Sequence, residues 1–296
     1  MKKTIFKGIG TALVTPMKEN GAVDLDAMGR LLDWQLECGI DAFIVCATTG
    51  EAPTLSDEEH INAIKFAAEH VNGRAPIVAG TGSNYTDHAV EMSKEAAAVG
   101  ADALLCVTPY YNKCTQQGVV ESYYRIADAT DLPMIVYNVP GRTGVNIKPD
   151  TYAKLAEHEN IVAIKEANGN IGEIVETMSK VKGKLDLYSG NDDQVVPLLS
   201  VGGIGCISVF SNIMPREAKM ITDKWFAGDI EGAAEVQLRY KALIDALFSE
   251  VNPIPVKAAL AAMGICGETM RLPLTPMAEE NRKKLLALMR EAGLKV

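Results

Sequence analysis

The sequence predicts an α/β fold in which a (β/α)8 TIM barrel precedes a small all-helical C-terminal domain, and three observations lead to this prediction. Eight short apolar runs recur along the chain, bounded by turn residues, as buried parallel strands are. The segments between these runs have a helical period. The eight units fit within about 230 residues, the size of such a barrel, whereas a doubly wound sheet more often has five or six strands.

The expected strands follow one another at regular intervals. They are Gly8 to Pro16, Ala42 to Thr48, Pro76 to Thr81, Ala103 to Pro109, Pro133 to Asn138, Ile161 to Ala167, Leu185 to Gly190 and Gly203 to Phe210. No G-x-G-x-x-G motif follows the first of them, so the sequence lacks the usual signal of a dinucleotide-binding sheet.

Helices are expected between the strands. One opens at Ser56 with a Ser-x-x-Glu capping box completed by Glu59, and Ile61 and Ile64 continue its apolar face. Others are expected at Asp24 to Cys38, Thr86 to Val99 and Gln117 to Ala129.

The last part of the chain has no strand-like run and is expected to be helical. Its predicted helices are Ile230 to Phe248, Pro255 to Met263 and Met277 to Ala292. We therefore predict two domains, a catalytic barrel over residues 1–228 and a helical domain over residues 229–296.

The composition is that of a soluble globular chain. It has 296 residues, of which 48% are hydrophobic and 23% are charged, which excludes a disordered or collagen-like protein. The net charge of -9 gives no attraction to nucleic acid or to anionic lipid, so we expect neither as a partner. An anionic substrate must therefore be held by a local positive group.

The sequence also predicts a cytoplasmic location. The six cysteines lie far apart with no Cys-x-x-Cys pair, as expected of reduced thiols. The longest apolar stretch, Val195 to Phe210, is interrupted by Pro197 and three glycines and is too short to span a membrane. The N-terminus lacks the apolar core and cleavage site of a signal peptide.

Lys165 is the most informative candidate for catalysis. It lies in the apolar run that starts at Ile161, and an ammonium group is costly to bury. Burial favours the neutral amine, which is the nucleophile that forms a Schiff base with a carbonyl substrate. The alternative is a strand-end lysine paired with an acid such as Glu166, and the residues alone leave both open.

Tyr137 ends the preceding strand and could transfer protons in the same cavity. A phenol is a poor base without help, and hydroxyls of Thr48 and of Tyr111 or Tyr110 could complete a proton relay. The alternative is a core tyrosine whose hydroxyl is satisfied by another partner.

Two further segments could bind a carboxylate. Arg142 follows Pro140 on a stiff turn, and Thr48 and Thr49 present hydroxyls just before a helix. A surface arginine and a plain turn are the alternatives. The four histidines lack metal-binding spacing, and no P-loop or G-x-S-x-G motif occurs, so no metal or cofactor is expected.

Taken in order, several motifs along the whole chain resemble those of the dihydrodipicolinate synthase family, in the wider group of pyruvate-dependent class I aldolases and N-acetylneuraminate lyases. The motifs are Gly10 to Pro16, Thr48 to Glu51, Val107 to Asn112, Tyr137 to Gly144, Ile164 to Ala167, Asn252 to Lys257 and Arg271 to Pro276.

The resemblance implies a Schiff-base condensation of pyruvate with L-aspartate-4-semialdehyde in diaminopimelate and lysine biosynthesis. It implies that Lys165 forms the imine and that Tyr137 is the acid and base. Thr48 and Tyr111 would complete the proton relay, with Tyr111 reaching across from a neighbouring subunit of a homotetramer, a dimer of dimers.

The resemblance also implies substrate-binding residues. Thr48 and Thr49 would hold the carboxylate of pyruvate, and Arg142 that of the semialdehyde. Gly190 and Ile207 would line the pocket with backbone carbonyls. Asn191 stands where many relatives have an aspartate.

The feedback site of lysine-inhibited relatives is only partly matched. His60, Asn84 and Tyr110 are retained. Ala52, Asp57 and His88 replace the usual Ser, His and Glu. We therefore expect weak or no inhibition by lysine.

Three other functions remain open at this stage. A sibling aldolase acting on a sialic acid or keto-deoxy sugar acid would share the lysine and the tyrosine, but sialic acid lyases typically have Ser-Thr at 48–49 and lack an arginine after Tyr-x-x-Pro. The others are a silent pyruvate-binding barrel, which would form no trapped adduct, and a metal-dependent barrel, which a chelator would inactivate.

Overall fold

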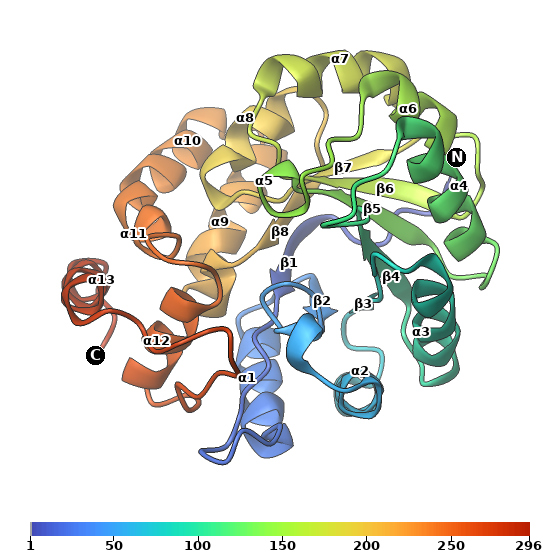
Figure 1. Cartoon of the computed structure of the whole chain (residues 1–296). Helices are drawn as coiled ribbons and strands as arrows, with labels where there is room; N and C mark the ends of the chain where they lie inside the picture. Colours follow the sequence, from blue (N-terminus) through green and yellow to red (C-terminus); the bar gives the residue numbers. More distant parts are fainter. Residues whose placement is uncertain (1) are drawn as a thin grey trace.

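The computed structural model of the chain describes residues 2–296 and forms the predicted barrel (Figure 1). Eight parallel strands pair in chain order, and β8 closes the sheet by pairing with β1. The strands are β1 Gly8–Ala12, β2 Ala42–Val45, β3 Ile77–Gly80, β4 Ala103–Val107, β5 Met134–Asn138, β6 Ile161–Glu166, β7 Asp186–Ser189 and β8 Gly205–Ser208. The prediction of eight strands from eight apolar runs is confirmed.

Helices surround the barrel and continue beyond it. They are α1 Leu25–Glu37, α2 Asp57–Val71, α3 Thr86–Ala98, α4 Gln116–Ala127, α5 Pro140–Thr143, α6 Pro149–Leu155, α7 Ile171–Val181, α8 Val195–Ser200, α9 Pro215–Phe226, α10 Ile230–Arg239, α11 Lys241–Ala246, α12 Ile254–Ala262 and α13 Glu279–Glu291. The capping box of Ser56 and Glu59 is present at the start of α2. None of the helices in the described part is long and apolar enough to cross a membrane.

One predicted helix is wrong in detail, because Ile230 to Phe248 is divided into α10 and α11. The division falls at Tyr240, whose ring lies 5.5 Å from that of Phe210 next to β8. After the bend, Leu243 and Leu247 are buried. The helical period does not reveal this bend, because it depends on packing against a distant segment. Since α10 packs on α9, the domain division at residue 229 stays a prediction.

The interior of the barrel is closed at the N-terminal end of the strands. Phe6, which precedes β1, stacks on Tyr188 with 4.3 Å between ring centroids. The Tyr188 hydroxyl donates a hydrogen bond of 2.6 Å to the Phe6 carbonyl oxygen. The carboxyl ends of the strands are thus left as the place for an active site, as in other barrels of this kind.

Candidate active site

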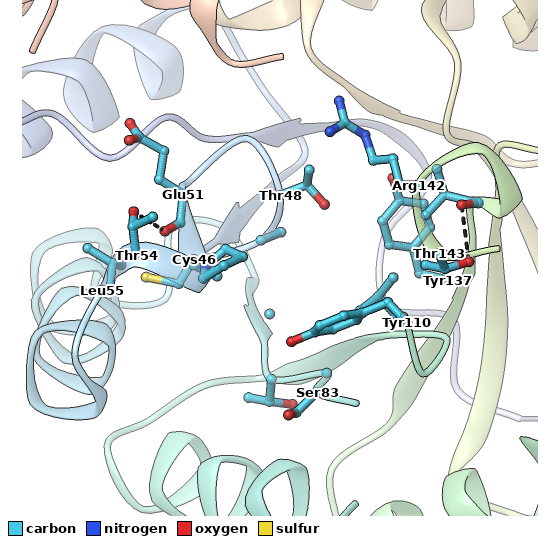
Figure 2. Close-up of a pocket in the computed structure, with 18 of the residues that line it drawn as sticks. Cys46, Thr48, Glu51, Thr54, Leu55, Ser83, Tyr110, Tyr137, Arg142 and Thr143 are labelled. Carbon is cyan, nitrogen blue, oxygen red and sulfur yellow. Dashed lines mark hydrogen bonds between the residues drawn. The ribbon is translucent and has the colours of Figure 1, made fainter. Parts of the chain in front are cut away.

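A cavity of about 720 Å³ opens at the carboxyl ends of the strands. Its wall includes Thr48 after β2, Tyr110 after β4, Tyr137 of β5 and Arg142 of α5, together with Asn252 from the C-terminal segment, residues 229–296. Figure 2 shows Thr48 and Arg142 near each other on one side of it. Candidate residues from the ends of β2, β4 and β5 are therefore brought to one place, whereas Thr49, Gly190 and Ile207 are not among the residues that line the cavity.

Lys165 lies beside this cavity with no counter-ion. Its residue is 4% exposed, and its ammonium is 4.2 Å from the ring centre of Tyr137, which belongs to the cavity wall. In the sheet, Lys165 is in register with Tyr137 on β5 and with Tyr188 on β7. No carboxylate of residues 2–296 forms an ion pair with it, so its amine is held by ring and chain packing.

The alternative pairing of Lys165 with Glu166 is wrong. Successive residues of a strand point to opposite faces of a sheet. The Glu166 carboxylate is accordingly turned toward the helices, where it accepts hydrogen bonds from the Tyr152 hydroxyl at 2.8 Å and the Asn138 amide at 2.9 Å. It also accepts one from the backbone of Asn168.

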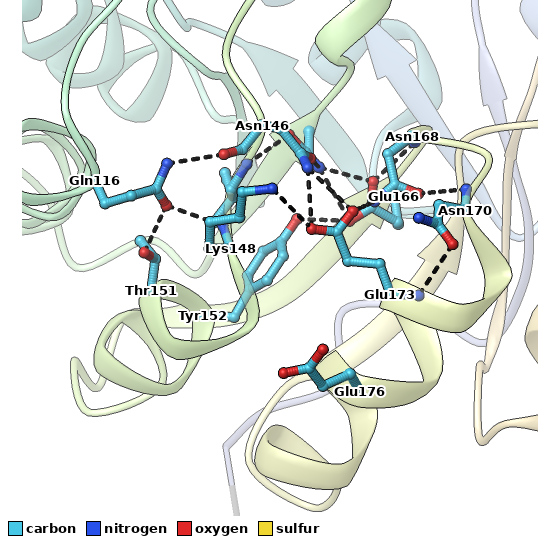
Figure 3. Close-up of polar contacts among 12 residues, drawn as sticks. Gln116, Asn146, Lys148, Thr151, Tyr152, Glu166, Asn168, Asn170, Glu173 and Glu176 are labelled. Atoms are coloured by element: carbon cyan, nitrogen blue, oxygen red, sulfur yellow. Dashed lines mark hydrogen bonds and ion pairs between the residues drawn. The ribbon is translucent and has the colours of Figure 1, made fainter.

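A polar network behind the barrel wall joins the ends of β5 and β6 (Figure 3). The Asn138 amide donates to both Glu166 and Asn146. Asn146 in turn donates to both carboxylate oxygens of Glu173 on α7. Because Asn138 and Glu166 directly follow Tyr137 and Lys165, this network fixes the backbone that carries both candidate catalytic residues.

Glu166 gives a prediction about stability and pH. Burial raises the pKa of Glu166 to about 7 from an ordinary value of 4.5. The folded state therefore binds this proton more tightly than the unfolded chain, so the group stabilises the fold below pH 4.5 and loses that effect as the pH rises through about 7. Relative to Glu166→Gln, the free energy of unfolding of the wild type should fall by about 3 kcal/mol over this range, measured by urea titration.

The Glu166→Gln variant suits this test, because the Tyr152 hydroxyl can rotate and accept from the new amide. Tyr152→Phe is the control, since it removes one hydrogen bond but keeps the titrating carboxyl. Its stability should depend on pH like that of the wild type. Parallel curves for the wild type and Glu166→Gln would show that Glu166 does not titrate in this range.

The hydroxyls of the predicted proton relay are not joined within one chain. Tyr137 is buried and Thr48 is partly buried, but Tyr111 is 89% exposed, and no hydrogen bond connects the three within residues 2–296. Tyr111 has a φ of 70°, a left-handed conformation that is uncommon for a residue with a Cβ. The structure thus presents Tyr111 outward at the cavity rim instead of packing it against Tyr137.

A hydrogen bond from the end of β4 fixes the segment that carries Arg142. The Thr108 hydroxyl at the end of this strand donates to that of Thr143, which follows Arg142, with 3.0 Å between the oxygens. Thr143 also bonds to the carbonyl of Val145. These contacts fix the short helix α5, from which the exposed side chain of Arg142 extends at the cavity wall (Figure 2).

Gly190 lies near Lys165, and neither Gly190 nor Ile207 is among the residues that line the cavity. A Cβ added to Gly190 would be 2.8 Å from the Ala167 Cβ and 3.2 Å from the Lys165 Cε, so only glycine leaves room for the lysine chain here. Ile207 is fully buried in the barrel interior with Tyr137. Asn191, beside Gly190, has its amide 3.4 Å from the Gln194 side-chain oxygen.

The residues expected at a feedback site are only partly brought together. His60 and Tyr110 line the cavity, and Asn84 does not. Asp57 and His88 pair with each other at 3.0 Å. Burial lowers the pKa of His60, whose Nε2 is 2.8 Å from the Gly80 carbonyl oxygen.

Sequence reasoning missed the roles of two buried polar residues, Asn252 and Lys257, that contact the segment after β2. Asn252 donates from its amide to the Thr49 hydroxyl at 3.0 Å. Lys257 forms an ion pair with Glu51 at 2.6 Å, and both side chains are completely buried. A lysine inside the apolar stretch of residues 254–262 was the signal that could have revealed this pair.

Among residues 2–296 there is no group of three or more His, Cys, Asp or Glu placed to hold a metal ion.

Comparison with known proteins places this site in a family. Residues 5–292 match the model of the Dihydrodipicolinate synthetase family. The chain is 52% identical over 293 residues to the 4-hydroxy-tetrahydrodipicolinate synthase of Caldicellulosiruptor bescii, and the match covers 99% of each protein.

Two solved structures have the same fold along their whole length. One is the dihydrodipicolinate synthase of Acinetobacter baumannii in complex with pyruvate, with a TM-score of 0.96, 44% identity and coverage of 98% of this chain and 100% of that one. The other is the synthase of Cyanidioschyzon merolae with lysine bound, with a TM-score of 0.96, 41% identity and coverage of 99% and 100%. The chain belongs to the dihydrodipicolinate synthetase family.

Proposed function

We propose that this chain catalyses the 4-hydroxy-tetrahydrodipicolinate synthase reaction, the condensation of pyruvate with L-aspartate-4-semialdehyde in lysine and diaminopimelate biosynthesis. The observation that carries the proposal is Lys165, a buried amine without a counter-ion beside Tyr137 at the carboxyl end of a barrel. The C. bescii relative carries the name of this activity.

The chemistry begins at Lys165. Its neutral amine attacks the keto carbon of pyruvate, and loss of water leaves an imine on Nζ. Loss of a proton from the pyruvate methyl group then gives an enamine, whose carbon attacks the aldehyde of the second substrate. Tyr137 supplies and accepts protons in these steps, with Thr48 and Tyr111 as its relay. No cofactor is needed, because the protonated imine accepts the electron pair that the methyl C–H bond leaves behind when the enamine forms.

The two substrate carboxylates are assigned to different residues of the site. Thr48 and Thr49 hold that of pyruvate, with the carbonyl groups of Gly190 and Ile207 completing the pocket. Arg142, exposed at the mouth, holds that of the semialdehyde, because a guanidinium can bind a carboxylate through two hydrogen bonds.

A homo-oligomer completes this proposal. Tyr111 is exposed at the cavity rim in one chain, which is expected of a side chain that reaches the site of a neighbouring subunit. We assign a homotetramer built as a dimer of dimers. The six cysteines are free thiols, which supports a cytoplasmic location.

Turnover of pyruvate with L-aspartate-4-semialdehyde tests the function, measured through a coupled nicotinamide-dependent reductase. Arg142→Ala should raise the KM for the semialdehyde by at least about tenfold, because one carboxylate loses its charged partner. It should leave the pyruvate concentration for half-maximal imine formation unchanged. An imine with pyruvate but no turnover would move the assignment to an aldolase acting on a sugar acid.

Lysine should inhibit this enzyme weakly or not at all. Asp57 and His88, which stand where inhibited relatives have histidine and glutamate, both line the cavity and pair with each other at 3.0 Å. Ala52 lacks a hydroxyl where inhibited relatives have serine. Steady-state rates measured with lysine up to millimolar levels should stay near those without it, and inhibition below that range would contradict this expectation.

A further inference from the structure

We propose that Lys257 and Asn252, both from the C-terminal segment, are positioning residues that hold residues 48–51 in the shape that binds a substrate carboxylate. Residues 48–51 are called the β2 loop below. The identity of that substrate as pyruvate rests on the proposed function. Lys257 is bonded to Glu51 and Asn252 to Thr49, so both are assigned an effect through the β2 loop.

Lys257 is bound from three directions. Its Nζ donates to the Glu51 carboxylate at 2.6 Å, to the Thr15 carbonyl at 3.1 Å and to the Thr269 carbonyl at 2.5 Å. The three protons of the ammonium are therefore all used. They join α12, the segment after β1 and the β2 loop at one buried point.

Glu51 holds the β2 loop in an uncommon conformation. Its φ of 58° is left-handed, a region that residues with a Cβ occupy mainly when their surroundings require it. Here the Glu51 carboxylate forms the ion pair with Lys257, and it also accepts a hydrogen bond of 3.4 Å from the backbone nitrogen of Arg271. Glu51 belongs to the cavity wall, and Figure 2 shows its side chain extending away from Thr48.

The rest of the β2 loop has little freedom to take another shape. The Thr15 hydroxyl donates to the Gly50 carbonyl at 2.7 Å. A Cβ on Gly50 would be only 3.1 Å from the backbone of Cys46. Because Gly50 and Glu51 are both held in place, they constrain the backbone that carries Thr48 and Thr49.

Asn252 acts on the same loop from the side of the cavity. Its amide donates to the Thr49 hydroxyl at 3.0 Å, and its backbone carbonyl is 3.5 Å from Nη2 of Arg142. One residue of the C-terminal segment therefore contacts both groups proposed to bind carboxylates. The C-terminal segment completes the wall of a site whose other residues come from the barrel.

These contacts could merely stabilise the fold, and the expected kinetics distinguish the two roles. A buried ion pair contributes little net stability compared with neutral side chains of similar shape. Replacing both partners by neutral residues should therefore preserve folding while freeing the loop. If the pair positions the loop, pyruvate binding weakens more than the chemical step slows.

The double variant Glu51→Gln, Lys257→Met tests this, because no buried charge is left unpaired. The measurement is borohydride trapping of the enzyme with increasing pyruvate, with the adduct read by mass. The pyruvate concentration for half-maximal trapping should rise by about tenfold, while kcat at saturating pyruvate changes by less than about threefold. Asn252→Ala, which disturbs no charge, should raise the same concentration by about threefold or more.

Arg282→Met is the matched control. It breaks the partly buried ion pair of Arg282 with Glu268, which lies within the C-terminal segment and includes no residue of the β2 loop. Half-maximal trapping should be unchanged in it, and thermal unfolding of each variant shows whether it is folded.

Unchanged half-maximal trapping in a folded double variant and in Asn252→Ala would overturn the positioning role. If the double variant does not fold, Asn252→Ala decides alone. A wild-type protein that forms no adduct with pyruvate would instead overturn the proposed function, and the positioning role with it.

Discussion

Replacing Lys165 by alanine is expected to abolish the adduct that borohydride traps with pyruvate and to lower turnover by at least about 10⁴-fold. The amine of Lys165 is the group on which we propose that the imine forms. The protein should remain folded, because the substitution removes a buried ammonium that has no counter-ion. Trapping, coupled turnover and thermal unfolding together measure these effects.

Lys113 supplies the control for this experiment. It is another lysine that borders the cavity, near Gly144, but it lies on an exposed segment after β4. Lys113→Ala should keep both the adduct and most of the turnover. An adduct that persists in Lys165→Ala and disappears in Lys113→Ala would show that the imine forms on Lys113, which would contradict our proposal.

The barrel could be predicted because its signal is local. Each strand is a short buried run, and each outer helix has an apolar face, so the alternation appears along the sequence itself. The bend at Tyr240 could not be predicted in this way. It depends on the ring of Phe210, thirty positions earlier in the chain, whose proximity only the folded structure shows.

The same reasoning that identified Lys165 applies to Lys257, and the two outcomes differ. Each is a lysine in an apolar stretch, and each is buried. Lys257 has a carboxylate and two carbonyl groups bonded to its ammonium. Lys165 has no hydrogen bond or ion pair of this kind within residues 2–296. An apolar context predicts burial, but only the arrangement of partners separates a reactive amine from a positioning one.

The direction of Glu166 and the environment of Tyr111 show two further limits. Alternation along a strand could have placed Glu166 on the face opposite Lys165, but the network with Tyr152 and Asn138 needs the folded chain. Tyr111 is exposed in the single chain and contacts no other hydroxyl of the relay there, so the role of Tyr111 stays a prediction.

The second large effect is expected for Tyr137→Phe. The ring that packs at 4.2 Å from the Lys165 ammonium is kept, so the position of the lysine and the stability of the fold should change little. Loss of the hydroxyl removes the proposed proton donor and acceptor, and kcat should fall by about 10² to 10⁴-fold. Borohydride should still trap the pyruvate adduct, at a slower rate. Coupled turnover and time courses of trapping measure the two effects separately.

Tyr188→Phe is the matched control, because Tyr188 is in register with Lys165 on β7, the neighbouring strand on the other side of β6 from Tyr137. Its hydroxyl is directed away from the site and donates to the Phe6 carbonyl. Its loss should cost about 1 kcal/mol of stability and leave kcat within about twofold of the wild type. Two tyrosines with the same register but different hydroxyl partners thus separate proton transfer from packing around the lysine. Equal losses of kcat in the two variants would mean that packing, and not the Tyr137 hydroxyl, controls the reaction.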